Sequence, residues 1–172
     1  MSHSLALLFV LFSVGIRLVP HLPNFSPIIG MGLFCGAAFP RRWALFVPLA
    51  AMGLGDLLLG WVPENFFGYI AIALSVGIGC ALRTKRSPIR IAGASLAGST
   101  LFYLISNGGV WLLGMLYPRT LEGLIDCYAA GIPFYRNSIL GDLVYTGVLF
   151  WCAQWVTRRV SQRSPAAANA SR

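Results

Sequence analysis

Hydrophobic residues are grouped along the chain into six stretches, separated by shorter segments that hold most of the Pro, Asn and charged residues. Each stretch is apolar almost all round, which is typical of a helix inside a membrane. The second stretch is short for a bilayer core of about 30 Å, so we expect it to be tilted, packed inside a bundle or extended by its flanks. The stretches are Ser4–Val19, Ser26–Phe39, Trp43–Trp61, Phe66–Leu82, Ile89–Ser106 and Ser138–Val156.

Composition excludes a soluble globular domain. Of the 172 residues, 57% are hydrophobic and only 10% are charged, against about 25% charged residues in soluble domains. A soluble domain of this length could not bury so much apolar surface. Six helices of about 20 residues with short connections fit the length. The sequence therefore predicts an all-α, polytopic membrane protein with a six-transmembrane-helix bundle.

The basic residues indicate the orientation of that bundle. Ten of the thirteen Lys and Arg residues follow the second, fourth or sixth stretch. Because cytoplasmic loops are enriched in Lys and Arg, we predict that both termini lie inside, in a multi-pass protein of the bacterial cytoplasmic membrane. The net charge of +8 then reflects contact with anionic lipid rather than nucleic acid. The ten residues are Arg41, Arg42, Arg83, Lys85, Arg86, Arg90, Arg158, Arg159, Arg163 and Arg172.

The first stretch has an alternative interpretation as a cleaved signal sequence, since Ser13 and Gly15 offer a small-residue cleavage site. No Lys or Arg precedes the apolar run, which favours a membrane helix. We therefore predict one transmembrane helical domain over residues 1–157. A basic, disordered cytoplasmic tail is expected over residues 158–172, which are polar and rich in Ala and Ser.

The predicted outer connections are Pro20–Phe25, Val62–Asn65 and Asn107–Asn137. The last one is long and contains many Gly, Pro and aromatic residues. Within it, apolar residues at helical spacing predict a helix over Thr120–Ala130, lying on the outer membrane surface or capping a cavity, with Thr120 as its N-cap. Those apolar residues are Leu121, Leu124, Ile125 and Tyr128.

Three charged residues lie inside the predicted spans. Asp56 and Asp142 are both placed roughly 6–9 Å below the outer ends of their stretches, given a rise of 1.5 Å per residue, and Arg17 lies in a comparable layer. An isolated charge at membrane depth costs at least about 2.5 kcal/mol, so these groups should pair or face a wet cavity. One interpretation is a structural ion pair between Arg17 and an Asp. The other is a polar floor for an outward-open ligand cavity.

The cavity interpretation gains support from other polar and aromatic residues expected at the same end. Asn24, Asn107, Arg136 and Asn137 would supply hydrogen bonds, and Trp111 and Tyr135 would stack on a ring of the ligand. Asp56 and Asp142 would orient a donor or neutralise Arg17. The candidate substrate-binding residues are therefore Arg17, His21, Asn24, Asp56, Asn107, Trp111, Tyr135, Arg136, Asn137 and Asp142.

Several chemical classes have no support in the sequence. The four Cys residues have no C-x-x-C spacing and the chain has two His residues, so we expect no metal site and no cofactor. There is no phosphate-binding loop and no recognised hydrolase motif, so we expect a protein that is not an enzyme. Two alternatives stay open. One is a membrane enzyme that uses Asp56 or Asp142 as general acid or base near His21, and the other is a structural subunit that packs through Gly32 and Gly36.

Two segments resemble a known family. Pro20–Ile28, followed by a Gly- and Ala-rich stretch, resembles the opening of a family of small bacterial membrane proteins that are described as transport proteins of unassigned substrate. The second signature is carried by Asn107–Trp111, Tyr117–Pro118, Cys127–Tyr128, Ile132–Phe134 and Asn137–Leu143. That family is similar in size and layout to the substrate-binding S components of energy-coupling factor (ECF) transporters.

The resemblance implies a six-helix bundle with both termini inside and an outer substrate cavity covered by loops. It also implies a separate coupling transmembrane subunit and two ATPases as partners. We therefore expect an S-component-like subunit that takes up a small nutrient, such as a vitamin or its precursor. The connections Pro20–Phe25 and Asn107–Asn137 would close over the ligand.

Overall fold

The computed structural model describes the backbone of residues 3–169 and the side chains of residues 7–159. Within this range the protein is all-helical, which confirms the all-α part of the predicted fold class, and the described backbone contains no strand. The helices are α1 (His3–Leu18), α2 (Ile28–Ala38), α3 (Arg41–Leu59), α4 (Asn65–Cys80), α5 (Pro88–Leu113) and α6 (Leu121–Asn169).

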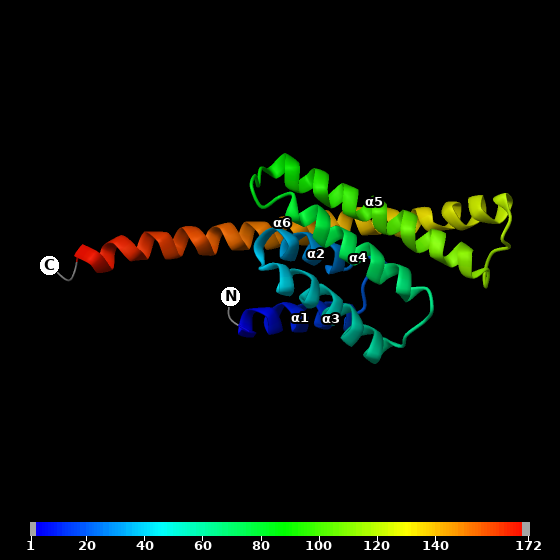
Figure 1. Cartoon of the computed structure of the whole chain (residues 1–172), viewed down its shortest axis with the longest axis horizontal. Helices are drawn as coiled ribbons and strands as arrows, with labels where there is room; N and C mark the ends of the chain where they lie inside the picture. The colour runs from blue at the N-terminus through cyan, green and yellow to red at the C-terminus, as the bar shows by residue number, and fades with distance from the viewer. Residues whose placement is uncertain (1–2, 170–172) are drawn as a thin grey trace.

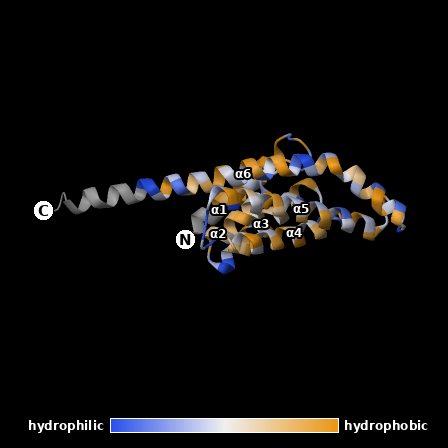
Figure 2. Cartoon of the chain, turned by 90° about the horizontal axis from the view of Figure 1, so that it is seen from above, coloured by the Kyte–Doolittle hydropathy of each residue, from blue (hydrophilic) through white to orange (hydrophobic). Residues whose placement is uncertain are grey.

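Successive helices run in opposite directions, so that α1 begins and α6 ends at the same end of the bundle (Figure 1). Three segments are long and apolar enough to cross a membrane: α3, α5 and Leu121–Arg159 of α6. The apolar helices α1, α2 and α4 are shorter. Hydrophobic residues predominate along the helices of the bundle (Figure 2), and large apolar side chains lie on its outer surface, such as Leu57 and Ile89, which are each 81% exposed. A surface of this kind is expected where lipid, rather than water, surrounds the helices.

Helix α2 forms the centre of the bundle. Ten of its eleven residues are buried, and it contacts α3, α4, α5 and α6. Its length is about 16 Å, at 1.5 Å per residue, about half of a bilayer core. The second apolar stretch is therefore packed inside the bundle, one of the three arrangements expected from its length.

Glycines allow α2 and α4 to approach each other closely. A Cβ atom on Gly32 would overlap the hydroxyl of Ser75, and one on Gly36 would overlap the carbonyl of Val76. From the other side, a Cβ on Gly79 would overlap the backbone of Leu33. The Gly32 and Gly36 pair thus serves packing inside the chain, as small residues commonly do between membrane helices.

Two arginines from the α4–α5 connection bind the carboxyl end of α2. Arg83 donates to the carbonyls of Gly36 at 2.7 Å and Phe39 at 2.8 Å, and Arg86 donates to the carbonyl of Ala37. These carbonyls lie at the helix end that carries partial negative charge, where cations are stabilising. Two of the basic residues that indicated the orientation therefore also hold α2 in place.

The prediction of a loop over Asn107–Asn137 is wrong. Helix α5 continues to Leu113, the connection spans only residues 114–120, and α6 runs without interruption from Leu121. The expected helix near Thr120–Ala130 exists, and the Thr120 hydroxyl accepts a hydrogen bond from the amide of Gly123 at 3.1 Å, as an N-cap does. That helix is the first part of α6 rather than a separate surface helix. The α5–α6 hairpin projects beyond the other helices along the long axis (Figure 1).

Hydrogen bonds from two tyrosine hydroxyls connect the two helices of this hairpin. The Tyr103 hydroxyl donates to the carbonyl of Tyr128, and the Tyr128 hydroxyl donates to the carbonyl of Leu104, both at 2.7 Å. These bonds join α5 and α6, the two helices of the hairpin.

At the carboxyl end, α6 continues to Asn169, within the segment 158–172 that is predicted to form the basic cytoplasmic tail. Residues 170–172 lie outside the described part of the chain.

Candidate ligand cavity

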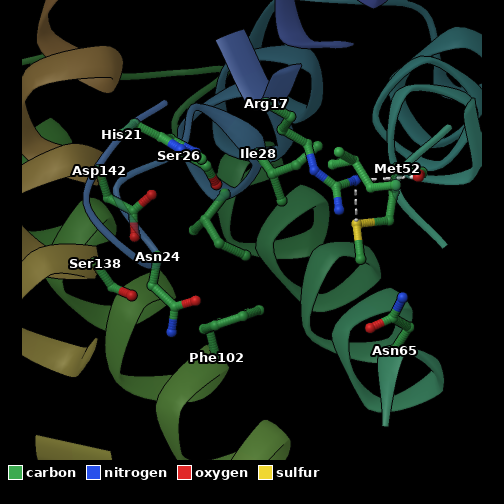
Figure 3. A pocket seen from close by; sticks show the side chains of 12 residues that line it. Arg17, His21, Asn24, Ser26, Ile28, Met52, Asn65, Phe102, Ser138 and Asp142 are labelled. Atoms are coloured by element: carbon green, nitrogen blue, oxygen red, sulfur yellow. Dashed lines mark hydrogen bonds between the residues drawn. The ribbon is translucent and has the colours of Figure 1, made fainter. Parts of the chain in front are cut away.

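A cavity of about 260 Å³ opens at the end of the bundle where α1 ends and α2 begins. Residues from six parts of the fold line it: the end of α1 with the α1–α2 connection, α2, α3, and the facing sides of α4, α5 and α6 (Figure 3). The polar lining residues are Arg17, His21, Asn24, Ser26, Asn65, Ser138 and Asp142, and the apolar ones are Ile28, Ile29, Met52, Leu59 and Phe102.

A tight turn sets the shape of the α1–α2 connection. The amide of Phe25 donates to the carbonyl of Leu22 at 2.9 Å, and Asn24 has a φ of 62°. Pro23 at the second position and Asn24 at the third suit a turn that needs a left-handed residue, because Asn tolerates that conformation. The side-chain amide nitrogen of Asn137, Nδ2, donates to the carbonyl of Pro23 at 3.0 Å. This bond holds the turn against α6. The local sequence thus places the Asn24 side chain at the cavity.

The expected ion pair joins α1 to α3. Arg17 Nη2 lies 2.9 Å from Asp56 Oδ1, and the Tyr69 hydroxyl donates to Asp56 Oδ2 at 2.8 Å. Arg17 Nη1 donates to the carbonyl of Met52 at 3.1 Å. The Asp56 side chain is only 3% exposed, whereas Arg17 is 16% exposed and reaches the cavity wall. Asp56 is therefore the buried partner of Arg17. Within the described residues it lines neither this cavity nor a second cavity beside it, which is described below.

Asp142 interacts with the amino end of α2. Its Oδ2 accepts a hydrogen bond from the Ser99 hydroxyl at 2.6 Å, and its carboxylate also bonds to the backbone amide of Gly30 in the first turn of α2. The N-cap residue Pro27 contributes no side-chain hydrogen bond, so the carboxylate from α6 takes over this function. An anion is stabilising at this end of a helix. Among the described side chains Asp142 has no ion-pair partner, since Arg17–Asp56 is the one ion pair found there.

Asn107 lines a second cavity of about 230 Å³, which shares Asn24, Asn65 and Phe102 with the first. The two cavities therefore adjoin. The side-chain nitrogen of Asn107 donates to the carbonyl of Tyr103 at 2.9 Å, and its side-chain oxygen lies against Gly131 of α6.

The remaining four predicted site residues line neither cavity. Trp111 Nε1 donates to the carbonyls of Pro118 and Thr120, each at 3.1 Å, at the tip of the hairpin. The Tyr135 hydroxyl lies 2.8 Å from Thr100 Oγ1, and its ring stacks on Tyr103. Arg136 is exposed, and Asn137 holds the turn described above. Trp111, Tyr135 and Asn137 instead form hydrogen bonds that join helices to each other or to a connection. They do so because their segment is helical and is not a loop over the cavity.

Sequence reasoning missed several lining residues. Ser138 lies four residues before Asp142 and so on the same face of α6, a spacing that could have revealed it. Asn65 begins α4, and Phe102 lies three residues after Ser99 in α5. No signal in the sequence distinguished Phe102 from a packing residue.

Some polar side chains of the lining are hydrogen-bonded within the protein, and others are not. Arg17 and Asp142 are bonded within the protein, as described above. Five others form no side-chain hydrogen bond within the described residues, and are available to a ligand: His21, Asn24, Ser26, Asn65 and Ser138. Apolar side chains form the rest of the wall, as in most small-molecule sites. The described residues hold no group of three His, Cys, Asp or Glu side chains suited to a metal ion.

The fold and this cavity define an all-helical protein with three helices long and apolar enough to cross a membrane, and with a polar recess at one end. The chain belongs to the family of unknown function DUF6580, whose sequence profile matches residues 1–166. No curated protein and no solved structure matches the chain significantly.

Proposed function

We propose that this protein is a six-pass subunit of the bacterial cytoplasmic membrane that captures a small nutrient from the outside, as S components of ECF transporters do. One observation carries the proposal: five polar side chains that form no side-chain hydrogen bond within the described residues line one cavity. Three of them, His21, Asn24 and Ser26, come from the α1–α2 connection, while Asn65 comes from α4 and Ser138 from α6. The buried hydroxyl of Ser138 would be costly to leave without a hydrogen-bond partner unless water or a ligand satisfied it.

The charge distribution supports the proposed orientation. The basic residues at the start of α3 and in the α4–α5 connection lie at the end where α1 begins, and the cavity lies at the opposite end. Placing the basic end in the cytoplasm opens the cavity to the outside. Helix α2 is too short to cross a bilayer, but it is shielded from lipid by its neighbours and does not need to cross alone.

The lining supports a small ligand with both polar and apolar parts. Amide and hydroxyl groups would read its hydrogen-bonding atoms, while Phe102 and Met52 would cover its apolar face. Binding rather than catalysis is favoured, because Asp56 is buried beside Arg17 and Asp142 is bonded to Ser99. The chain has no phosphate-binding loop, so energy for uptake would come from a coupling subunit and ATPases.

The proposal is tested with the purified protein, by native mass spectrometry for a co-purified small molecule and by titration with a panel of vitamins and precursors. We expect a ligand that binds in the nanomolar to micromolar range. Replacing Ser138→Ala or Asn65→Ala should each weaken binding about five-fold, the equivalent of one hydrogen bond of about 1 kcal/mol.

Thr157→Ala is the matched control, because that hydroxyl bonds to the carbonyl of Ala153 at the other end of the bundle. It should bind the ligand as the unaltered protein does. Absence of any ligand across the panel, or unchanged affinity in the Ser138 and Asn65 variants, would count against the cavity as a binding site.

A further inference from the structure

A second hollow lies between α5 and α6, toward the basic end of the bundle. It consists of two adjoining cavities of about 270 and 290 Å³ that share Phe150 and Gln154. The cavity nearer the middle of the bundle is lined mainly by apolar residues, among them Ile91, Leu143 and Trp151. The other cavity is lined by polar and basic residues. We refer to the two together as the α5–α6 groove.

Two features of the helices create this groove. Helix α5 begins at Pro88, whereas α6 continues to Asn169, so α6 extends beyond its partner (Figure 1). Small residues line the wall: a Cβ atom on Gly147 would meet open space, and Ala92 also borders the apolar half. The apolar half is therefore a trough in the surface that faces lipid in the proposed membrane arrangement.

The polar half carries uncompensated positive charge. Arg86 and Arg158 both line it, and Arg86 uses one of its nitrogens on the carbonyl of Ala37. Every acidic residue of the chain lies toward the other end of the bundle: these are Asp56, Glu64, Glu122, Asp126 and Asp142. Among the described side chains no carboxylate therefore neutralises the two guanidinium groups, which leaves them available to an anion from outside the chain.

We propose that the α5–α6 groove binds one anionic phospholipid of the cytoplasmic leaflet. Its phosphate lies between Arg86 and Arg158, since guanidinium groups bind phosphate with charge-assisted hydrogen bonds. One acyl chain lies in the trough along Ile91, Gly147 and Phe150. Basic pockets between membrane helices on the cytoplasmic side recognise lipid headgroups in this way.

The position of Gln154 fits the same occupant. It borders both cavities and lies about 6 Å along α6 from Arg158, at 1.5 Å per residue. Its amide is therefore placed where the ester groups of a phospholipid follow the phosphate. A free phosphate ion would satisfy the arginines but would leave the apolar trough uncovered, which is why we assign the site to a lipid. The inference rests on the proposed orientation and is independent of the outer cavity.

The test is native mass spectrometry of the full-length protein in detergent with phosphatidylglycerol or phosphatidylcholine of the same acyl chains. We expect one phosphatidylglycerol molecule to be retained in preference to phosphatidylcholine. Arg158→Gln should reduce this retention about ten-fold, as the loss of a charge-assisted hydrogen bond does. Arg159→Gln is the matched control, since Arg159 stacks over Trp155 at 5.1 Å and does not line the groove.

A second pair of variants tests the trough. Gly147→Leu should fill it and reduce phosphatidylglycerol retention, whereas Gly77→Leu, at a position in α4 with equally open space, should not. Equal retention of the two lipids, or equal effects of Arg158→Gln and Arg159→Gln, would overturn the proposal. Loss of retention in Gly147→Leu but not in Arg158→Gln would also overturn it, because the groove would then hold an acyl chain without reading the headgroup. Failure to find a nutrient for the outer cavity would leave all of these outcomes unchanged.

Discussion

Replacing Gly36→Ala is expected to lower the free energy of unfolding by about 3 kcal/mol, the upper part of the usual range for overpacking a core. The added methyl group would overlap the carbonyl of Val76, which belongs to the backbone of α4. A backbone carbonyl cannot rotate away as a side chain does, so α2 and α4 would have to separate. Because α2 contacts four other helices, that separation would disturb the centre of the bundle. Chemical unfolding in detergent measures the change.

Gly77→Ala is the matched control for this prediction. Gly77 lies in α4, one residue after Val76, but a Cβ atom there meets open space. Alanine has the higher helix propensity, so this substitution should be neutral or stabilise the protein by about 0.5 kcal/mol. Equal destabilisation by both variants would contradict close packing of α2 on α4. A Gly36→Ala protein as stable as the unaltered one would do the same.

Replacing Arg17→Met is expected to lower the free energy of unfolding by about 3–5 kcal/mol, the usual cost of leaving one member of a buried ion pair without its partner. Asp56 has two side-chain hydrogen-bond partners, Arg17 and Tyr69, and it would keep only the bond from Tyr69. The double variant Arg17→Met with Asp56→Leu should regain much of that loss, because apolar residues often replace a buried pair at little cost. A double-mutant cycle measured by unfolding gives the coupling energy.

The cycle also separates the two interpretations of Arg17. If the double variant were as unstable as the sum of the two single variants, the pair would contribute no coupling, and the structural interpretation would be wrong. A stable double variant that still binds ligand would show that the pair only joins α1 to α3. A stable double variant that has lost ligand binding would show that Arg17, which reaches the cavity wall, also contacts the ligand.

The helices inside the bundle could be predicted from sequence because their hydrophobicity is continuous. The hairpin beyond it could not, because its glycines and proline have a different role from the one assumed. Gly109 allows the ring of Phe67 to pack against α5, and Gly108 lies against the hydroxyl of Tyr128. Both glycines therefore serve close packing, while the connection itself begins at Gly114, with a φ of 65°. Sequence alone does not distinguish a glycine required by a neighbour from one required by a turn.

Only part of the candidate site was predicted correctly, because that prediction also depended on which segments are helices and which are loops. Arg17 and Asp142 stood out because charged residues are rare inside apolar stretches, and His21 and Asn24 lie in a true connection. Trp111 was assigned to the cavity on the assumption of a loop, and the continuation of α5 points it elsewhere. Ser138 was missed because a serine in a membrane helix commonly bonds to its own backbone. Its spacing of four residues from Asp142, on the same face of α6, was the one signal that it faces the cavity.

The claim on which the proposed function depends is that the recess at the cavity end opens to the outside of the cell. Its most direct test is labelling of intact spheroplasts with a membrane-impermeant maleimide, in a protein whose exposed Cys80 and Cys152 are replaced by serine. We predict that Asn65→Cys, at the cavity, reacts in intact spheroplasts, and that Thr84→Cys, in the α4–α5 connection, reacts only after they are lysed. The reverse pattern, or labelling of both positions before lysis, would contradict the account.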